Sequence, residues 1–65
     1  MRITYNTCKD LVSIINKVKV QRGEHTLIIQ RRNGYIAIDD NSHRFITCGN
    51  SKEIYQFLKG IYYEL

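Results

Sequence analysis

Few residues in this sequence have side chains suited to catalysis or metal binding: two histidines, two cysteines and one adjacent pair of aspartates, which are His25, His43, Cys8, Cys48, Asp39 and Asp40. Adjacent strand residues point to opposite faces of a sheet, so the two aspartates are not placed to act as a paired acid and base. The histidines are expected to be solvated polar residues at the ends of strands. No glycine-rich phosphate loop, GxSxG motif or HExxH motif is present. The sequence therefore predicts that the protein is not an enzyme.

The cysteines are predicted to be two reduced thiols. A zinc site would need both histidines together with both cysteines, and their spacing matches no zinc template. A single disulfide is the alternative, but small secreted scaffolds usually carry several bridges. We therefore expect no metal, no cofactor and a cytoplasmic protein.

The net charge of +4 favours contact with a polyanion or an acidic protein surface. Four arginines could supply such contacts, namely Arg22, Arg31, Arg32 and Arg44. Two interpretations stay open, because these charges either bind nucleic acid or solvate strand edges and discourage aggregation.

Length and composition predict a single folded domain over residues 1–65. Hydrophobic residues make up 43% and charged residues 25%, which is usual for folded chains, and no proline or low-complexity linker marks a boundary. No apolar run approaches the roughly 18 residues of a membrane span, and the N-terminus lacks the apolar segment of a secretory signal. We therefore expect no membrane contact.

Hydrophobic spacing predicts a helix near each end of the chain. Thr7 is a suitable N-cap for a first helix over residues 7–20, which Gly23 can close. Asn50 and Glu53 form a capping pair for a second helix over residues 51–63, in which Gly60 would allow a close approach to a neighbour. The apolar stripes are Leu11, Ile14, Ile15 and Val18 in the first helix and Ile54, Phe57, Leu58, Ile61 and Leu65 in the second.

The segment between the helices predicts three strands. Asn33-Gly34 is a strong signal for a two-residue hairpin loop, because both central residues of a type I′ turn need positive φ. A second two-residue loop at residues 41–42 would place Asp39 beside Arg44 and Ile38 beside Phe45. Alternation in residues 2–5 predicts a short additional edge strand.

Alternation along these strands divides their residues between two faces. The predicted core face holds Leu27, Ile29, Ile36, Ile38 and Phe45, and the opposite face holds Ile28, Gln30, Arg32, Tyr35, Ala37, Arg44 and Ile46. Because each helix has one apolar stripe, we expect both to cover the core face. The predicted fold is a two-layer α+β domain of order α-β-β-β-α, with a three-stranded antiparallel meander.

The face opposite the helices is the predicted binding surface. It combines β-branched residues with a tyrosine and arginines, a composition found in protein interfaces. Alternatively, the segment MRITY or the segment IYYEL folds over this face and makes it ordinary core. The predicted binding residues are Ile28, Gln30, Arg32, Tyr35, Arg44 and Ile46.

Two resemblances bear on function. The order of elements resembles the double-stranded-RNA-binding domain, but the lysine cluster of that family is reduced here to Lys52 beside Glu53. The segments LIIQRRNGYIAI and SKEIYQFLKGIYYEL resemble small phage-encoded anti-defence proteins, including anti-CRISPR inhibitors of the α-β-β-β-α type. The nucleic-acid mimics in that group are acidic and this chain is basic, so DNA mimicry is not implied.

These features predict a non-catalytic protein-interaction module. The second resemblance implies a phage or mobile-element inhibitor of a host protein, acting in the bacterial or infected-host cytoplasm. Its partner would be a host protein surface or a second copy in a homodimer. The alternative is a small basic nucleic-acid-binding protein.

Overall fold

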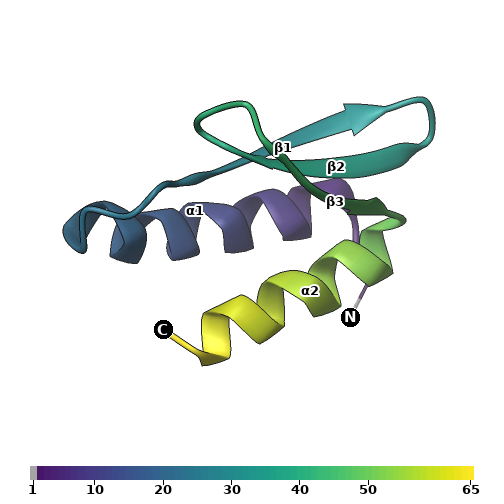
Figure 1. The fold of residues 1–65 in the computed structure, drawn as a ribbon. Helices are drawn as coiled ribbons and strands as arrows, with labels where there is room; N and C mark the ends of the chain where they lie inside the picture. Colours follow the sequence, from purple (N-terminus) through teal and green to yellow (C-terminus); the bar gives the residue numbers. More distant parts are fainter. Residues whose placement is uncertain (1) are drawn as a thin grey trace.

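The computed structural model describes residues 2–65 and shows the predicted α-β-β-β-α order (Figure 1). The three strands form one antiparallel sheet in the order β1-β2-β3. The elements are α1 (Tyr5–Gln21), β1 (Leu27–Arg32), β2 (Tyr35–Asp40), β3 (Phe45–Gly49) and α2 (Ser51–Tyr63).

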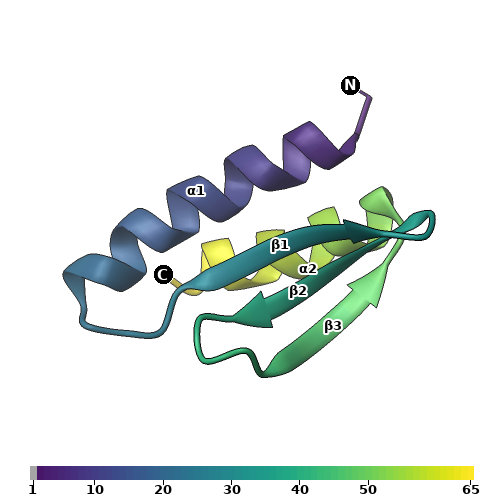
Figure 2. The same ribbon diagram turned by 90° about the horizontal axis from the view of Figure 1, so that it is seen from above.

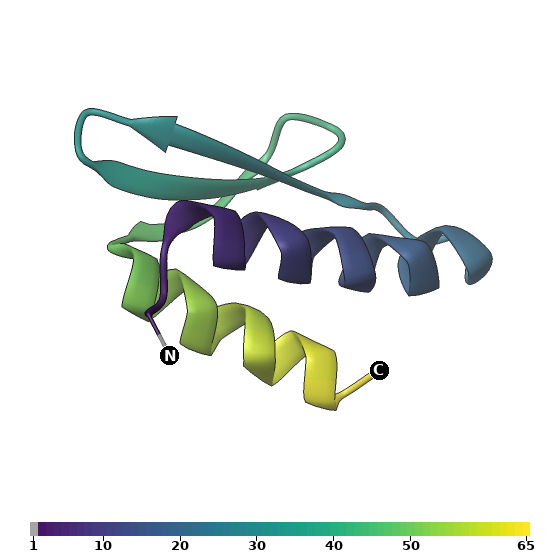
Figure 3. The ribbon, with the colours of Figure 1, turned by 180° about the vertical axis from the view of Figure 1, so that it is seen from behind.

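Both helices lie on the same side of the sheet, so the predicted two-layer α+β fold is confirmed (Figures 1 and 3). Viewed from above, α1 runs beside the free edge of β1, whereas α2 runs beneath the sheet (Figure 2). Accordingly, α1 contacts β1 and α2, and α2 contacts β2 and β3.

The buried side chains form one hydrophobic cluster between the sheet and the helices. It includes the predicted strand residues Leu27, Ile36 and Ile38, and Ile29 packs against it. The helices contribute Cys8, Leu11, Val12, Ile15, Ile54 and Leu58. Every residue of the described chain that is buried is hydrophobic, so this core contains no network of polar side chains.

Helix α1 begins earlier than predicted. Its N-cap is Thr4, and Thr7 is the third helical residue, whose hydroxyl accepts a hydrogen bond from the Thr4 backbone N–H at 3.2 Å. The predicted edge strand over residues 2–5 is therefore wrong, because this capping box starts the helix at Tyr5. The C-terminal prediction is confirmed, since Gly23 has a φ of +70° and its N–H donates to Val20 O.

Helix α2 has the predicted bounds and cap. The Asn50 side chain accepts from the Glu53 N–H at 2.8 Å, and the Glu53 carboxylate accepts from the Asn50 N–H at 2.9 Å. The prediction for Gly60 is wrong, because a Cβ at this position would meet no atom within 4 Å.

The first hairpin has the predicted register, with Arg32 paired with Tyr35 and Ile28 with Asp39. Its two-residue loop has positive φ at both residues, 40° at Asn33 and 85° at Gly34. Since this backbone is the one a type I′ turn requires, the turn sets the alignment of β1 and β2.

Gly34→Val is expected to destabilise the protein by about 1–3 kcal/mol, because a β-branched residue resists positive φ. There is open space where the side chain would go, so backbone strain is the cause rather than a clash. Urea denaturation measures the effect, and Gly34→Asn is the control because asparagine tolerates this conformation. Equal losses in the two variants would contradict the strain argument.

The second hairpin differs from the prediction. Strands β2 and β3 are joined by residues 41–44 rather than by two residues, and His43 has a φ of +67°. A β-bulge follows, so that Ile38 pairs with Thr47 and Asp39 pairs with Phe45. The predicted pairs of Asp39 with Arg44 and Ile38 with Phe45 are therefore wrong.

The two cysteines are free thiols. Cys8 is fully buried in α1, and its Sγ donates to Ser51 O at 3.3 Å. Burial raises the pKa of the Cys8 thiol, which keeps it protonated. Cys48 is exposed on β3.

Candidate functional site

The candidate site is the face of the sheet that no helix covers, called here the open face. In the first hairpin it carries Ile28, Gln30 and Arg32 from β1 and Tyr35, Ala37 and Asp39 from β2. Because directly paired residues share a face, β3 adds Phe45, which pairs with Asp39, and Cys48, which pairs with Ala37.

Phe45 lies on the open face rather than in the core, so its predicted core position is wrong. The β-bulge inserts one extra residue in β3, and a shift of one residue moves a side chain to the opposite face. Phe45 is consequently 62% exposed and is absent from the hydrophobic cluster. The bulge thus places an aromatic ring on the candidate site.

Three large apolar side chains are exposed here. Tyr35 is 39% exposed and Ile46, the extra residue of the bulge, is 38% exposed. Together with Phe45 they place apolar area from two neighbouring strands in water. Ala37 is only 2% exposed although it lies outside the core cluster, because its paired neighbours Gln30 and Cys48 are longer.

A small polar network crosses the same face. The Arg32 guanidinium donates to Gln30 Oε1 at 3.0 Å and 2.6 Å from its Nε and Nη2 atoms. Its Nη2 atom also lies 3.9 Å from a carboxylate oxygen of Asp39 on the neighbouring strand. These contacts hold the arginine over the sheet and partly neutralise its charge.

Arg44 occupies a different place from the other predicted site residues. It lies in the loop before β3, and its backbone N–H donates to the Asp40 carboxylate at 3.1 Å. The same carboxylate oxygen accepts from the Ser42 N–H at 2.9 Å and from the Ser42 hydroxyl at 2.6 Å. Asp40 therefore fixes the loop that leads into Phe45.

Asp40 makes the loop sensitive to acid. The Ser42 hydroxyl and the Arg44 N–H hold the pKa of Asp40 below its ordinary value of 3.8. A carboxyl group whose pKa is lower in the folded state than in the unfolded chain stabilises the folded state at pH values above its unfolded pKa. This stabilisation is lost as the pH falls through the pKa of the folded state. Parent protein is thus expected to exceed Asp40→Ala in melting temperature by a constant margin above about pH 5, and by less at lower pH.

Thermal unfolding of the parent and the variant between about pH 2 and pH 6 measures this margin. Comparing the two proteins at each pH cancels the titration of the other carboxylates. A margin that stays constant down to the lowest pH would show that the Asp40 charge does not stabilise the loop.

Neither end of the described chain folds over the open face. Residues 2–4 lead into α1 on the helical side, and Ile3 packs against the core from there. The C-terminus also lies on the helical side, where Leu65 packs against the core (Figure 1). The alternative in which these segments convert the open face into core is therefore wrong for residues 2–65.

The arginines do not converge on one surface. The Arg22 guanidinium donates to the main-chain oxygen of Leu65 at 2.7 Å, and the Arg31 guanidinium lies 4.5 Å from the centre of the Tyr5 ring. Both contacts are on the helical side, whereas Arg32 lies on the open face. The four residues thus share no continuous cationic stripe.

The histidines and carboxylates are also dispersed. His25 Nδ1 lies 2.7 Å from Asn41 Oδ1, where it links the segment before β1 to the second loop. Within residues 2–65, no group of three or more histidine, cysteine or acidic residues is placed to hold a metal ion.

No helix of this part of the chain is long and apolar enough to cross a membrane.

Sequence reasoning brought together Ile28, Gln30, Arg32, Tyr35 and Ile46, and the structure places them on or beside the same face. It missed Phe45 and Asp39. The signal that could have placed Phe45 on this face is the segment Asp-Asn-Ser, which favours turns of several lengths and so allows a loop longer than two residues before β3.

Comparisons with family models, curated proteins and solved structures found no protein significantly similar to this chain.

Proposed function

We propose that this protein is a non-catalytic interaction module that binds another protein through the open face. The observation that carries the proposal is the exposure of Tyr35, Phe45 and Ile46 on a sheet face that no other element covers. Exposed apolar residues standing singly are ordinary, but a group bordered by polar side chains is typical of an interaction surface. Burying this apolar area would contribute roughly 25 cal/mol per Å² of favourable free energy, from which the entropy cost of association is subtracted.

The contacts of the arginines favour a protein partner over nucleic acid. Phosphate binding relies on several cations that face the same backbone, whereas these arginines lie on different sides. The cation that does lie on the open face, Arg32, is engaged by Gln30 and Asp39. Tyrosine and arginine are also enriched among residues that dominate protein interfaces.

The finer proposal follows from the resemblance to small phage anti-defence proteins. On that basis, the protein is a phage or mobile-element inhibitor that acts in the bacterial cytoplasm on a host protein. The open face would serve the host partner or, in a homodimer, a second copy. The strand spacing and closing helix support this assignment, and the structure adds the uncovered face on which such a partner would bind.

Tyr35→Ser with Phe45→Ser tests the proposal. Both side chains are exposed, so the variant is expected to keep the circular dichroism spectrum of the parent and to lose self-association or partner capture. Ile14→Ser with Phe57→Ser is the matched control, because these residues are 47% and 36% exposed and lie on the helices. Sedimentation measures the oligomeric state, and immobilised protein tests capture from a bacterial lysate.

Binding by the control variant and not by the open-face variant would support the proposal. An open-face variant that folds and retains every interaction of the parent would refute it. Duplex RNA and DNA probes test the alternative function, since phosphate binding should weaken with a log-log salt slope near one per phosphate neutralised. Steep salt dependence, together with loss of binding in Arg31→Ala with Arg32→Ala, would replace the proposal with nucleic-acid binding.

A further inference from the structure

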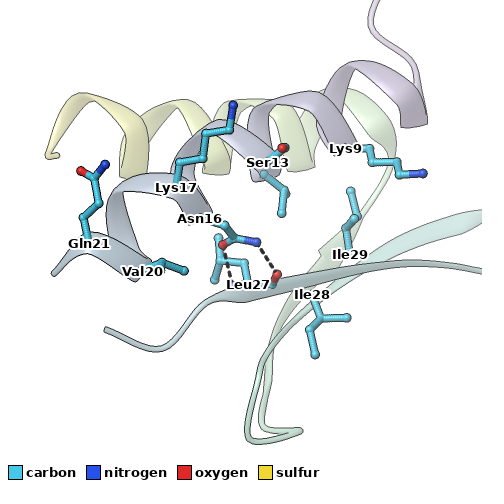
Figure 4. Close-up of a pocket in the computed structure, with 10 residues that line it drawn as sticks. Lys9, Ser13, Asn16, Lys17, Val20, Gln21, Leu27, Ile28 and Ile29 are labelled. Carbon is cyan, nitrogen blue, oxygen red and sulfur yellow. Dashed lines mark hydrogen bonds between the residues drawn. The ribbon is translucent and has the colours of Figure 1, made fainter. Parts of the chain in front are cut away.

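A second surface lies on the other side of β1, in the groove between this edge strand and α1. The groove has a volume of about 750 Å³, and Figure 4 shows its two walls. Val12, Leu27 and Ile29 give it an apolar lining, and Lys9 and Lys17 belong to the helical wall. It shares with the open face only Ile28, so it is a separate site.

The strand wall of the groove exposes unpaired backbone groups. Asn16 of α1 donates to Leu27 O at 2.9 Å and accepts from the Leu27 N–H at 2.8 Å (Figure 4). The backbone of Leu27 therefore points away from β2. Because alternate strand residues direct their N–H and C=O groups to the same side, those of Ile29 and Arg31 also point away from β2.

Ile29 and Arg31 thus form an open edge. Within residues 2–65, no loop backbone hydrogen-bonds to either residue, and the side-chain hydrogen bonds that reach the backbone of β1 are those of Asn16 with Leu27. The Asn16 side chain is the hydrogen-bond partner of this edge at Leu27, so the stretch of unpaired backbone begins after Leu27. An extended peptide laid beside β1 could form up to four backbone hydrogen bonds there, which is the mode of binding called strand addition.

The charge of the groove selects the kind of peptide. Its ten lining residues include two lysines and no acidic residue. Lys9 and Lys17 are both exposed and lie eight residues apart, two helical turns along the same side of α1. A second copy fits poorly, because β1 carries Arg31 and Arg32 and no acidic residue, so the β1 strand of another copy would bring no carboxylate to Lys9 and Lys17.

We propose that the groove between α1 and β1 binds an extended acidic peptide segment of another protein by strand addition to Ile29 and Arg31. Alternate apolar side chains of the peptide would enter the groove against Val12 and Ile29. Because neighbouring residues of a strand point to opposite faces, its acidic residues would lie on the same set of alternate positions, flanking the apolar ones, and so face Lys9 and Lys17 on α1. This inference goes beyond the proposed function, because it uses a different surface and a different mode of recognition.

The probe for the test is a capped heptapeptide with glutamate at positions 1 and 7, valine at positions 3 and 5 and threonine at the even positions, so that valine and glutamate share one face. It is titrated at neutral pH and followed by NMR and calorimetry. Binding should slow hydrogen exchange at the amides of Ile29 and Arg31. Two further peptides carry N-methyl groups on every odd-numbered residue or on every even-numbered residue. Because only alternate residues of an added strand bond to the edge, one of them should bind at least about ten-fold more weakly and the other should be little changed.

Protein variants test the charge selection. Lys9→Glu with Lys17→Glu should weaken binding of the peptide by about ten-fold, since both lysines border the groove. Arg44→Glu with Lys52→Glu is the matched control, because it changes the net charge equally at exposed residues outside the groove, and an effect within about two-fold is expected.

The expected pattern would support the groove as a peptide site. The proposal is overturned if the peptide does not bind at about 1 mM, if the two N-methylated peptides bind equally, or if both charge variants lose equal affinity. Amide changes at Tyr35 and Phe45 in place of Ile29 and Arg31 would likewise overturn it, while leaving the proposed function of the open face intact.

Discussion

Leu58→Ala is expected to lower the free energy of unfolding by about 2–5 kcal/mol. Leu58 is 0% exposed and is one of the largest fully buried side chains of the protein. It belongs to α2, which closes the cluster beneath β2 and β3. Removing its terminal carbons loses their transfer free energy and leaves a cavity that a rigid sheet cannot fill by collapse.

The effect is large relative to the total stability of the chain. Small domains bury a limited fraction of their surface, and a single core below about 70 residues rarely supplies more than 3–5 kcal/mol. Leu58→Ala is therefore expected to unfold a substantial fraction of the protein at 37 °C. Urea denaturation followed by circular dichroism measures the loss, and Leu58→Met provides a second variant that keeps the volume and should fold.

Phe57→Ala is the control on the same helix. Phe57 is 36% exposed, so its removal leaves no enclosed cavity and should cost less than Leu58→Ala despite the larger number of atoms removed. Equal losses at the two positions would mean that α2 does not bury its Leu58 face in the core.

The parts of the fold that follow from the sequence are those set by local interactions. Asn33 and Gly34 accept positive φ readily, so a two-residue turn and the register of the first hairpin could be derived together. Asn50 and Glu53 satisfy each other's backbone N–H groups, so the start of α2 was equally determined. Four of the six predicted site residues, Ile28, Gln30, Arg32 and Tyr35, lie on this hairpin.

The second hairpin could not be derived in the same way. Its four-residue loop depends on one carboxylate oxygen of Asp40 that serves three donors, and on a positive φ at His43, which is uncommon outside glycine. Neither feature has a strong sequence signature. An error of two residues in loop length, combined with the bulge, was enough to assign Phe45 to the wrong face.

The start of α1 shows a related limit. Thr4 and Thr7 are both good capping residues three positions apart, and their side chains cap each other's backbone N–H groups. From the sequence, Thr7 is predicted as the N-cap, one helical turn after the observed N-cap at Thr4. In the structure the helix starts at Tyr5, which packs against the core and whose ring lies under the Arg31 guanidinium.

The pairing of α1 with the edge of β1 has no sequence signal. Asn16 is a polar residue in a predicted helix, a position usually occupied by solvated side chains. Its role depends on the tertiary placement of a helix beside a strand, which brings a side-chain amide to the backbone of Leu27. An amide carries one donor and one acceptor group and so matches the N–H and C=O of a strand residue.

Asn16→Ala is expected to destabilise the protein by about 1–3 kcal/mol, because it leaves both backbone groups of Leu27 without a protein partner. Leu27 is 7% exposed, so water replaces these bonds poorly. Urea denaturation measures the loss. Hydrogen exchange locates it, since the Leu27 amide should exchange faster while the Gln30 amide in the β1–β2 ladder changes only with global stability.

Asn16→Asp separates the two hydrogen bonds. A carboxylate can still accept from the Leu27 N–H, but it cannot donate to Leu27 O and instead places negative charge beside that carbonyl. The variant should therefore be less stable than the parent at neutral pH. Below the ordinary aspartate pKa of about 3.9 a neutral carboxyl can donate, so the difference from the parent at the same pH should narrow as pH falls. Parent-like stability of both Asn16→Ala and Asn16→Asp at neutral pH would mean that the amide does not stabilise the β1 edge, and the free stretch of that edge would then extend to Leu27.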